Sequence, residues 1–349
     1  MLSNNQQVNP PRVSIFIPTY NRAHLLAQAI ESALAQDYPA LEIIVSDNAS
    51  SDETERVVSR YLTDSRLRYI RIIENIGMVR NWAQLLHRPT SAEWFIILSD
   101  DDYLTDPTFV RRALALAAED DDIRMVYAPG KVLYEMEGAE VCMRIPYNRI
   151  EDGKRVFINR DKLVKPVEFI LCGVLFHRRT AIDLHAFHDP DNISCDADLF
   201  FRISLSFKIG VLQGLVCVYR YHGENILTGH KTWAQLVSVL RMYFDLWHEA
   251  LTKSGISPID LEEWKIRVLL RACRSFIIET VKFERTGSAL KRAIAHLRGH
   301  APDLLSAIVL NTPFLAKLVV ARYPNLNKKL IRIRNRLIIL RSRLMHTQV

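Results

Sequence analysis

Short apolar runs alternate with segments of helical periodicity over the first hundred residues, and this alternation restricts the fold more than any other feature. Val13 to Pro18 and Leu41 to Asp47 are rich in Val and Ile, and Ala23 to Gln36 between them has apolar residues at helical spacing. Helix, strand, helix and strand patterns then follow in turn at Glu53 to Leu62, Leu67 to Ile73, Met78 to Leu86 and Trp94 to Leu98. Such alternation predicts an α/β fold in which a mostly parallel sheet is flanked by helices.

The pattern changes farther along the chain. Strand or hairpin patterns occur at Ile123 to Pro146, Val167 to Phe176 and Ile209 to His222, and a helical pattern at Asp196 to Ser206. After about Gly223 long helical periodicity remains, without strand signals. We therefore expect a short disordered arm over residues 1–11, an α/β domain over 12–224 and a helical region over 225–349.

Composition restricts where the protein works. The five cysteines form no CxxC pair, so neither a zinc ribbon nor a disulfide framework is indicated, and a reducing cytosol fits. Residues 1–11 are polar and lack the apolar centre of a signal peptide. No stretch reaches the ~18 continuous apolar residues of a spanning helix. We expect a cytoplasmic protein that does not cross a membrane.

Positive charge is concentrated at the carboxyl end. The net charge is +7, but no Asp or Glu follows Asp303, whereas nine Lys or Arg do. Residues 1–303 carry 37 basic and 39 acidic side chains, a net charge of −2. We therefore expect the tail, and not the body, to meet an anionic surface, and we expect no nucleic-acid partner.

An apolar stripe runs along the basic tail. Its members are three and four positions apart, which places them on one face of a helix: Leu326, Leu330, Ile333, Leu337, Leu340 and Leu344. A helix that is apolar on one side and rich in Arg on the other suits the interface of an anionic membrane. The same spacing also fits a coiled-coil seam, as in a homodimer, or packing on the protein itself.

Polar side chains follow each of the first four predicted strands. In open α/β sheets, ligands sit beyond the carboxyl ends of the strands. Three adjacent carboxylates, Asp100 to Asp102, come directly after the strand at Trp94 to Leu98. They repel one another unless a cation neutralises them, and oxygen ligands suit Mg²⁺ or Mn²⁺, which could bridge two phosphates. The alternative is a helix N-cap before Asp106 to Ala118, for which one Asp would suffice.

Residues 13–222 resemble family 2 glycosyltransferases with the GT-A fold. The resemblance rests on four segments that occur in the family's order and spacing, at the predicted strand ends: Val13 to Arg22, Asp47 to Asp52, Asn75 to Asn81 and Ser99 to Asp102. It implies a GT-A catalytic domain, a Rossmann-like nucleotide-diphospho-sugar transferase, followed by the helical region. The chain departs from the commoner family pattern at Ser46 and Ser99, where many members carry Asp.

The resemblance also implies roles for individual residues. Those that match the donor-binding positions are Pro18, Thr19, Tyr20, Asn21, Arg22, Asp47, Asn75, Gly77, Asn81 and Asp100. By this match Tyr20 lies against the base and Asp47 accepts a hydrogen bond from it, which favours UDP over adenine nucleotides. By the same match Asp100 contacts the ribose, and the metal ligands are Asp101, Asp102 and His222.

Asp196 resembles the residue that acts as catalytic base in inverting members of the family. A carboxylate there can take the proton from an acceptor hydroxyl as that hydroxyl attacks the anomeric carbon. The alternative for Asp196 is a plain helix cap, since Asp is a leading N-cap residue. His222 has an alternative as a structural histidine at a strand end, and His185 and His188, with no further ligand nearby in sequence, are expected in a loop.

These features together favour an inverting glycosyltransferase that uses Mn²⁺ or Mg²⁺. The expected donor is a UDP-linked sugar, and the expected acceptor is a glycan or a lipid-linked saccharide in cell-surface polysaccharide biosynthesis, at the inner face of the cytoplasmic membrane. One alternative is a sugar nucleotidyltransferase, although the loop Pro18 to Arg22 lacks the glycines of a phosphate-cradling loop. A second alternative is a non-catalytic nucleotide- or glycan-binding module on the same fold.

Overall fold

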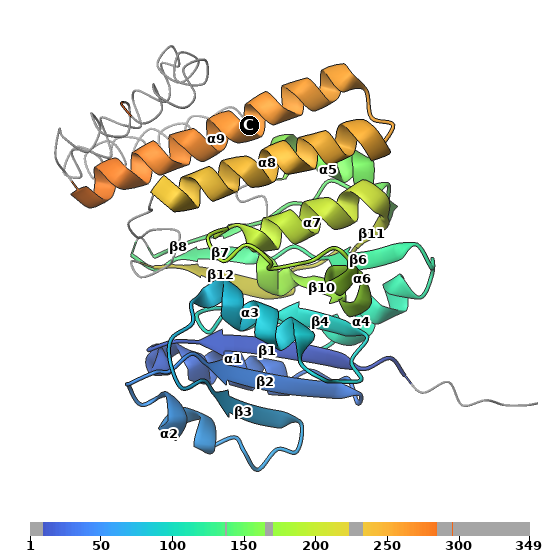
Figure 1. The fold of residues 1–349 in the computed structure, drawn as a ribbon. Coiled ribbons are helices and arrows are strands. Elements are labelled where there is room, and N and C mark those ends of the chain that lie inside the picture. The colour runs from blue at the N-terminus through green and yellow to red at the C-terminus, as the bar shows by residue number, and fades with distance from the viewer. Residues whose placement is uncertain (1–9, 137, 165–169, 223–232, 285–294, 296–349) are drawn as a thin grey trace, which may run out of the picture. The chain divides into compact units, whose positions relative to one another are not determined.

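The computed structural model of the chain describes residues 10–136, 138–164, 170–222, 233–284 and 295 (Figure 1). The predicted amphipathic helix of the tail and most of the predicted N-terminal arm lie outside these residues. The chain divides into two compact units, one made of residues 1–223 and 244–261 and the other of 224–243 and 262–349. The predicted boundary between residues 224 and 225 stays a prediction.

An eight-stranded mixed sheet forms the centre of the first unit, in the order β3-β2-β1-β4-β10-β6-β11-β9. Its strands are β1 (Val13–Thr19), β2 (Leu41–Asp47), β3 (Leu67–Arg71), β4 (Trp94–Ile97), β6 (Ile123–Tyr127), β9 (Ile150–Glu151), β10 (Val174–His177) and β11 (Lys208–Val211). The first four are mutually parallel along the sheet, whereas β10 runs antiparallel to both β4 and β6. The predicted α/β class with a mostly parallel sheet is confirmed.

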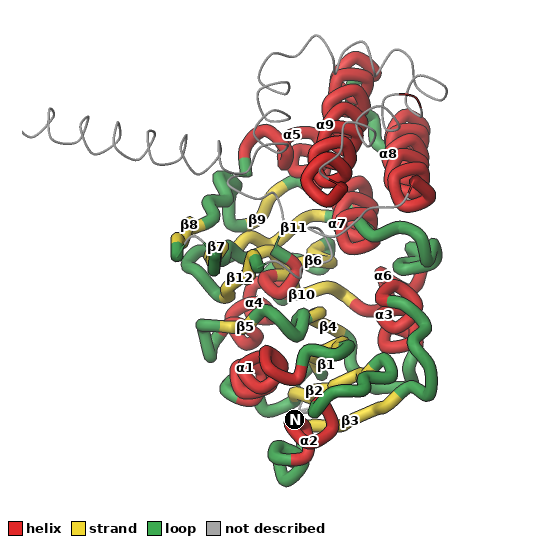
Figure 2. Tube along the Cα trace, turned by 90° about the vertical axis from the view of Figure 1, so that its left-hand side faces the viewer, coloured by secondary structure: helices red, strands yellow, loops and turns green. Residues whose placement is uncertain are grey.

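Helices cover both faces of this sheet. They are α1 (Ala23–Leu34), α2 (Thr54–Ser59), α3 (Met78–His87), α4 (Phe109–Ala117), α5 (Gly153–Leu163), α6 (Arg178–Asp183) and α7 (Cys195–Ser206), with a 3₁₀ turn, η1, at Leu171–Gly173. Figure 2 shows α1 and α4 on one side of the sheet and α3 and α6 side by side on the other.

The central strands are buried on both faces, as their unbroken Val and Ile runs predict. Phe16, Phe95 and Phe176 stack across β1, β4 and β10, with ring centroids 5.6 and 5.4 Å apart. Aromatic pairs of this kind contribute about 0.5–1.5 kcal/mol beyond the area they bury. This stack ties the antiparallel strand β10 to the parallel half of the sheet.

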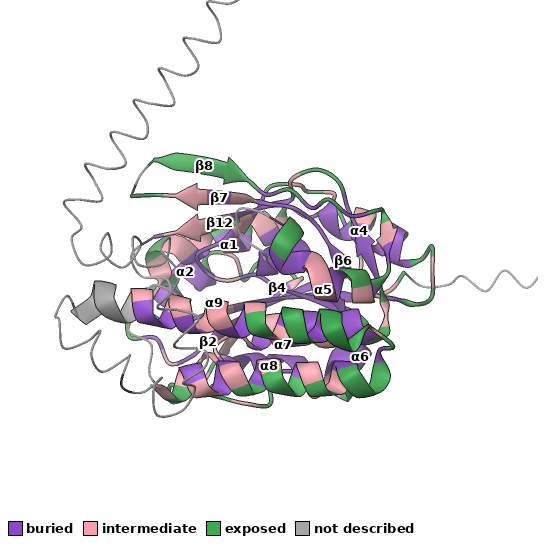
Figure 3. Cartoon of the chain, turned by 90° about the horizontal axis from the view of Figure 1, so that it is seen from above, coloured by how far each residue is buried: buried purple, intermediate pink, exposed green. Residues whose placement is uncertain are grey.

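A second, four-stranded sheet has the order β5-β12-β7-β8. It contains β5 (Tyr103–Leu104), β7 (Lys131–Tyr134), β8 (Ala139–Cys142) and β12 (Cys217–Tyr221). The edge strand β8 is exposed throughout (Figure 3). Strand β12 lies between β5 and β7. Because β5 directly follows the Asp triplet, the pairing of β12 with β5 brings the end of β12 to that triplet.

Two expectations from the sequence differ from the structure. Ile209 to His222, predicted as one strand, forms β11 and β12 in different sheets, and the break contains Gly214 at φ +88°. A backbone angle in this region favours glycine, so the chain turns there. The segment predicted as a strand at Val167 to Phe176 becomes a strand from Val174, after η1; residues 165–169 lie outside the described residues.

Two long helices, α8 (Trp233–Lys253) and α9 (Pro258–Glu284), follow the α/β region. Edge-to-face ring pairs within the second unit join them, Tyr243 with Trp264 at 6.0 Å and Trp233 with Phe276 at 5.9 Å. In the described part of the chain, no helix is both long and apolar enough to span a bilayer.

Candidate active site

The carboxyl ends of β1, β2 and β4 meet at one edge of the large sheet because these strands are parallel neighbours. The loops that follow them, together with the loop after β3, carry the four segments singled out in the sequence. Three residues in these loops have left-handed backbone angles: Asn21 at φ 52°, Ala49 at φ 66° and Gly77 at φ 84°. Left-handed angles at non-glycine residues are uncommon and cluster at ligand-binding loops.

Side-chain hydrogen bonds join the loop after β1 to the loop after β2. Asn21 donates its backbone N–H to Ser50 Oγ at 2.9 Å, and Asn21 Oδ1 accepts the backbone N–H of Ser51 at 2.7 Å. Asp52 Oδ2 accepts the N–H of Ala23 at 2.9 Å, and its other oxygen accepts that of Thr54 at 3.1 Å. Asp52 therefore accepts the first N–H of both α1 and α2 and ties the starts of the two helices together.

Arg22 lies against two carboxylates of the Asp triplet. Its Nη1 is 3.0 Å from Asp100 Oδ1 and 2.8 Å from Asp101 Oδ2. The carboxylate side chains are 4% and 7% exposed and the arginine 16%, so these ion pairs are largely shielded from solvent. The Arg22 guanidinium therefore partly neutralises these two carboxylates, and the predicted divalent cation stays a prediction.

Asp102 has a different environment from its neighbours. Its Oδ1 accepts the backbone N–H of Arg220 on β12 at 3.0 Å. Two residues farther along, His222 Nε2 lies 3.1 Å from Asp101 Oδ2. Asp102 therefore holds the end of β12, and that strand end presents His222 to Asp101.

Burial sets the electrostatics of the triplet. It raises the pKa of Asp100 to about 6, against the lowering effect of the Arg22 charge, and the Asp101 carboxylate raises it further. Burial and the negative charge of Asp101 also raise the pKa of Asp102 well above its usual range. Asp100 Oδ2 is buried without a hydrogen-bond partner among the described residues. A further cation beside Arg22 would therefore favour the ionised forms of Asp100 and Asp102.

Asp47 is fully buried at the end of β2. Its Oδ2 accepts the Tyr69 hydroxyl at 2.6 Å and its Oδ1 accepts the Ser50 N–H at 2.7 Å. Burial and this contact raise the pKa of Tyr69, which keeps the phenol a donor. Each carboxylate oxygen has a second lone pair, so Asp47 retains the capacity to accept from a base. Tyr69 was not among the residues selected from the sequence.

The start of α3 and the residues just before it carry three of the predicted donor-binding residues, Asn75, Gly77 and Asn81, and their contacts differ. Asn75 Oδ1 accepts from Asn48 Nδ2 at 3.0 Å and from the Gly77 N–H at 2.9 Å. Asn81 is buried, and its Oδ1 accepts the Ser46 hydroxyl at 2.6 Å. Asn81 thus ties α3 to β2, whereas Asn75 and Gly77 are exposed at the edge of the site.

The end of β1 offers both a buried and an exposed group. Pro18 is half-buried, and Thr19 is buried with a hydroxyl that has no hydrogen-bond partner among the described residues. Tyr20 is 45% exposed. An exposed aromatic ring at a strand end can stack on a planar ligand.

Asp196 is the second residue of α7 and is half-buried. Its Oδ1 accepts the Ala197 N–H at 2.8 Å, so it also satisfies one donor of the helix start. Burial raises its pKa, while the Ala197 hydrogen bond and the charge of Arg160 act in the opposite direction. Arg160, on α5, is buried with its guanidinium 4.4 and 4.3 Å from the ring centroids of Phe200 and Phe201.

The structure brings together Arg22, Asp100, Asp101 and His222 in direct contact, with Asp102 supporting them. Among the described residues, no group of three or more His, Cys, Asp or Glu is arranged as a metal-binding set. Arg160 and Tyr69 were missed from the sequence, because nothing in their own segments shows that they approach Asp196 and Asp47.

Solved structures define the class of this fold. TarS from S. aureus (residues 1–349, with UDP-GlcNAc) superposes with a TM-score of 0.58 at 14% identity over 89% of each chain. The mannosyltransferase PcManGT from Pyrobaculum calidifontis, in complex with GDP-Man and Mn²⁺, gives 0.53 at 18% identity over 91% of this chain and 88% of its own. At these identities the likeness shows the fold, which is GT-A.

Sequence comparison gives the family. Residues 14–179 match the model of Glycosyl transferase family 2, and this part of the chain belongs to that family. The E. coli chondroitin synthase is 27% identical over 282 residues, which are 78% of this chain and 37% of that protein. The GalNAc(5)-diNAcBac-PP-undecaprenol beta-1,3-glucosyltransferase of Campylobacter jejuni is 36% identical over 131 residues, 37% of this chain and 40% of that protein. The chain therefore spans less than half the length of these two relatives.

Proposed function

We propose that the protein is an inverting glycosyltransferase that moves a sugar from a UDP-linked donor to a glycan or lipid-linked acceptor. The observation that carries this proposal is the buried cluster of Arg22, Asp100, Asp101 and His222 at the carboxyl edge of a GT-A sheet. Two relatives support it by name, a chondroitin synthase and a glucosyltransferase whose name includes a PP-undecaprenol acceptor.

The residues of the cluster fit a divalent cation. Carboxylate oxygens and an imidazole nitrogen are ligands that Mn²⁺ accepts, and Asp100 Oδ2 is a buried oxygen with an unused lone pair. Asp101 and His222 would hold the cation, while Asp102 is already engaged with β12. When bound, such a cation stabilises the negative charge that develops on the departing diphosphate.

Asp196 is the proposed general base. It would accept the proton of the acceptor hydroxyl while that oxygen forms a bond to the anomeric carbon, and the bond from this carbon to the diphosphate oxygen breaks. Attack opposite the leaving group inverts the anomeric centre. A raised pKa suits a base, because a stronger base takes a proton more readily.

The donor pocket is proposed from the loops around the cluster. Tyr20 would stack on the base, and Asp47, held by Tyr69 and Ser50, would accept its N–H. A uracil ring has such an N–H, which favours UDP. TarS, a neighbour in fold, has been solved with UDP-GlcNAc.

Hydrolysis of nucleotide sugars without acceptor tests the enzymatic part of the proposal. We expect slow, Mn²⁺-stimulated release of UDP from at least one member of a panel of UDP sugars, and little from GDP or ADP sugars. The sugar that is cleaved should also raise the temperature of unfolding, because a ligand of the native state stabilises it by mass action. If no nucleotide sugar were hydrolysed and none stabilised the protein, the proposal would be refuted and a non-catalytic module would be favoured.

The tail supports attachment to the inner face of the cytoplasmic membrane. Residues 325–349 contain seven of the nine basic residues that follow Asp303 and the whole apolar stripe. Attraction of about 1 kcal/mol per basic residue near an anionic surface, together with burial of the stripe, gives reversible binding. Full-length protein should sediment with anionic vesicles and deletion of residues 325–349 should abolish this. Equal recovery of both proteins would show that the tail has another use, such as a homodimer seam.

A further inference from the structure

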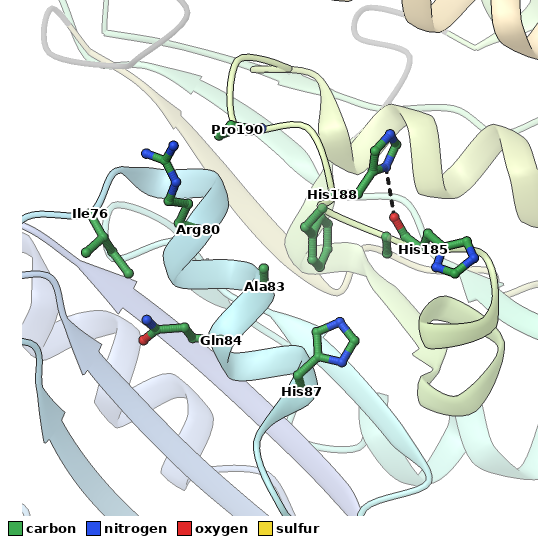
Figure 4. Close-up of a pocket in the computed structure, with 10 residues that line it drawn as sticks. Ile76, Arg80, Ala83, Gln84, His87, His185, His188 and Pro190 are labelled. Carbon is green, nitrogen blue, oxygen red and sulfur yellow. Dashed lines mark hydrogen bonds between the residues drawn. The ribbon is translucent and has the colours of Figure 1, made fainter.

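A cavity of about 450 Å³ lies beside α3 (Figure 4), and its lining does not include the Asp triplet. One wall is the exposed face of α3, with Arg80, Gln84 and His87 at helical spacing, while Val79 and Trp82 face the core. The facing wall is the segment after α6, which carries His185 and His188. Its volume is that of a small-molecule site.

The polar lining of this cavity is cationic or hydrogen-bond donating. Arg80 makes no ion pair or hydrogen bond within the described part of the chain, and it is exposed. His188 Nδ1 donates to the carbonyl of His185 at 2.9 Å, which fixes that ring. None of the described residues that line the cavity is Asp or Glu. Asp189, next in the chain to His188, accepts the N–H of Asp191 and is not part of the lining.

Backbone angles hold the facing wall in an unusual shape. His185 has φ 54° and Phe187 has φ 63°, both in the left-handed region. Phe187 is buried edge-on against Trp82 of α3, with centroids 5.6 Å apart, and this contact anchors the segment. Strain of this kind costs about 1–3 kcal/mol per residue and persists where the surroundings enforce it, commonly at ligand sites.

The chain connects the two walls of the cavity to the donor loops and to α7. Ile76, part of its lining, donates its N–H to Asn48 Oδ1 in the donor loops. Pro190, on the opposite wall, is six residues before Asp196, and six residues of chain span at most about 20 Å. This upper limit is within the length of a short oligosaccharide, so one acceptor could contact both Asp196 and the cavity.

We infer that this cavity binds an acidic part of the acceptor, a sugar bearing a carboxylate or a phosphate, with Arg80 as its charge partner. His87 and His185 donate further hydrogen bonds, since even a neutral imidazole carries one N–H. The apolar remainder of the lining, including Ala83 and Ile76, receives the C–H faces of the sugar ring. The assignment to the acceptor rests on the proposed glycosyl transfer.

We expect the site to act on affinity and not on chemistry, because its lining contains neither Asp196 nor a residue of the Asp triplet. Arg80→Gln should raise KM for an acidic acceptor about tenfold and leave kcat unchanged, as expected when a contact is equal in ground state and transition state. Arg68→Gln is the matched control. Arg68 is also exposed, on β3, and its substitution removes the same charge.

Binding can be measured before the natural acceptor is identified. We would titrate full-length protein with glucuronate, glucose 6-phosphate and glucose, and follow the ring signals of His87, His185 and His188 by NMR. At least one of the two anionic sugars should shift these signals, glucose should not, and Arg80→Gln should weaken the effect about fivefold or more. The stronger of the two anions identifies the acidic group.

The same variants separate this inference from the proposed function. Equal responses to glucose and the anionic sugars, or unchanged binding in Arg80→Gln, would overturn the cavity assignment even if UDP-sugar hydrolysis is normal. A second outcome is that Arg80 binds the anionic sugars but the protein neither binds nor hydrolyses any nucleotide sugar. This outcome would overturn both the acceptor role and the proposed function, and the cavity would then be a site for acidic sugars without a role in transfer. Normal UDP affinity with Mn²⁺ in Arg80→Gln is expected throughout.

Discussion

The acidic cluster at the sheet edge and the cationic cavity beside α3 are built in opposite ways. The cluster buries the carboxylates of Asp100, Asp101 and Asp102, and one arginine neutralises part of their charge. The cavity instead presents an exposed arginine and histidines without a charge partner in its lining. Buried charge is costly unless it is paired, whereas exposed charge costs little. The first arrangement suits a tightly held cation, and the second suits a weakly held, exchangeable anion.

Asp101→Asn tests the acidic side most severely. The change removes one negative charge at the atom that contacts both Arg22 and His222, so transfer should fall by at least about 1,000-fold. Asp121→Asn makes the same change at an exposed position and should have no effect. Steady-state transfer with Mn²⁺ measures both. Near-normal transfer by Asp101→Asn would remove the metal role.

Asp196→Asn should affect chemistry without affecting the donor. Transfer should fall by the ~10²- to 10⁴-fold that general-base catalysis contributes. Calorimetry should show UDP affinity equal to that of the unmodified protein, because Asp196 lies on α7 and not in the donor loops. Unimpaired turnover would leave Asp196 as a helix-start residue that binds the Ala197 N–H.

Arg22→Ala should strengthen the binding of Mn²⁺, whereas Asp101→Asn should weaken it. Without the guanidinium at Asp100 and Asp101, Mn²⁺ meets no competing cation, and its affinity for nucleotide-free protein should rise roughly tenfold. Calorimetric titration with Mn²⁺ measures this, with Arg68→Ala as the control. Weaker Mn²⁺ binding in Arg22→Ala would mean that Arg22 organises the carboxylates and does not compete.

Arg160→Met should give the smallest effect, seen in the pH profile. The positive charge of Arg160 lowers the pKa of Asp196, so removing it raises that pKa further. A base must be deprotonated to act, and therefore the acid limb of kcat/KM should move to higher pH. Activity should fall several-fold on the acid limb of the profile and little at alkaline pH. Arg160→Lys keeps the charge and should restore the profile, whereas identical profiles for all three proteins would exclude the electrostatic role.

The sequence predicts the parallel half of the sheet well because those strands are unbroken apolar runs. It does not predict α5, whose residues Gly153–Leu163 are rich in charged side chains, or the short helix α6. The order of the strands cannot be predicted from the sequence either. The contact of His222 with Asp101 was therefore not predicted, because it depends on the pairing of β12 with β5.

Site prediction had a similar limit. A carboxylate triplet after a strand is a local signal and was found. Arg22 was selected for the nucleotide, but its ion pairs with residues nearly eighty positions later are tertiary. The cavity was missed because Arg80 and His87 read as the polar face of a helix and His185 and His188 as a loop. The helical spacing of Arg80, Gln84 and His87 was the available signal.

The most direct test of the account is whether UDP binding by the unmodified protein depends on a divalent cation. Calorimetric titration with UDP would be run with Mn²⁺ and again with EDTA. The buried carboxylates repel a diphosphate unless a cation lies between them, so we expect affinity at least about 100-fold higher with Mn²⁺. Equal affinity in EDTA would contradict the account, because Arg22 alone would then suffice to neutralise the cluster.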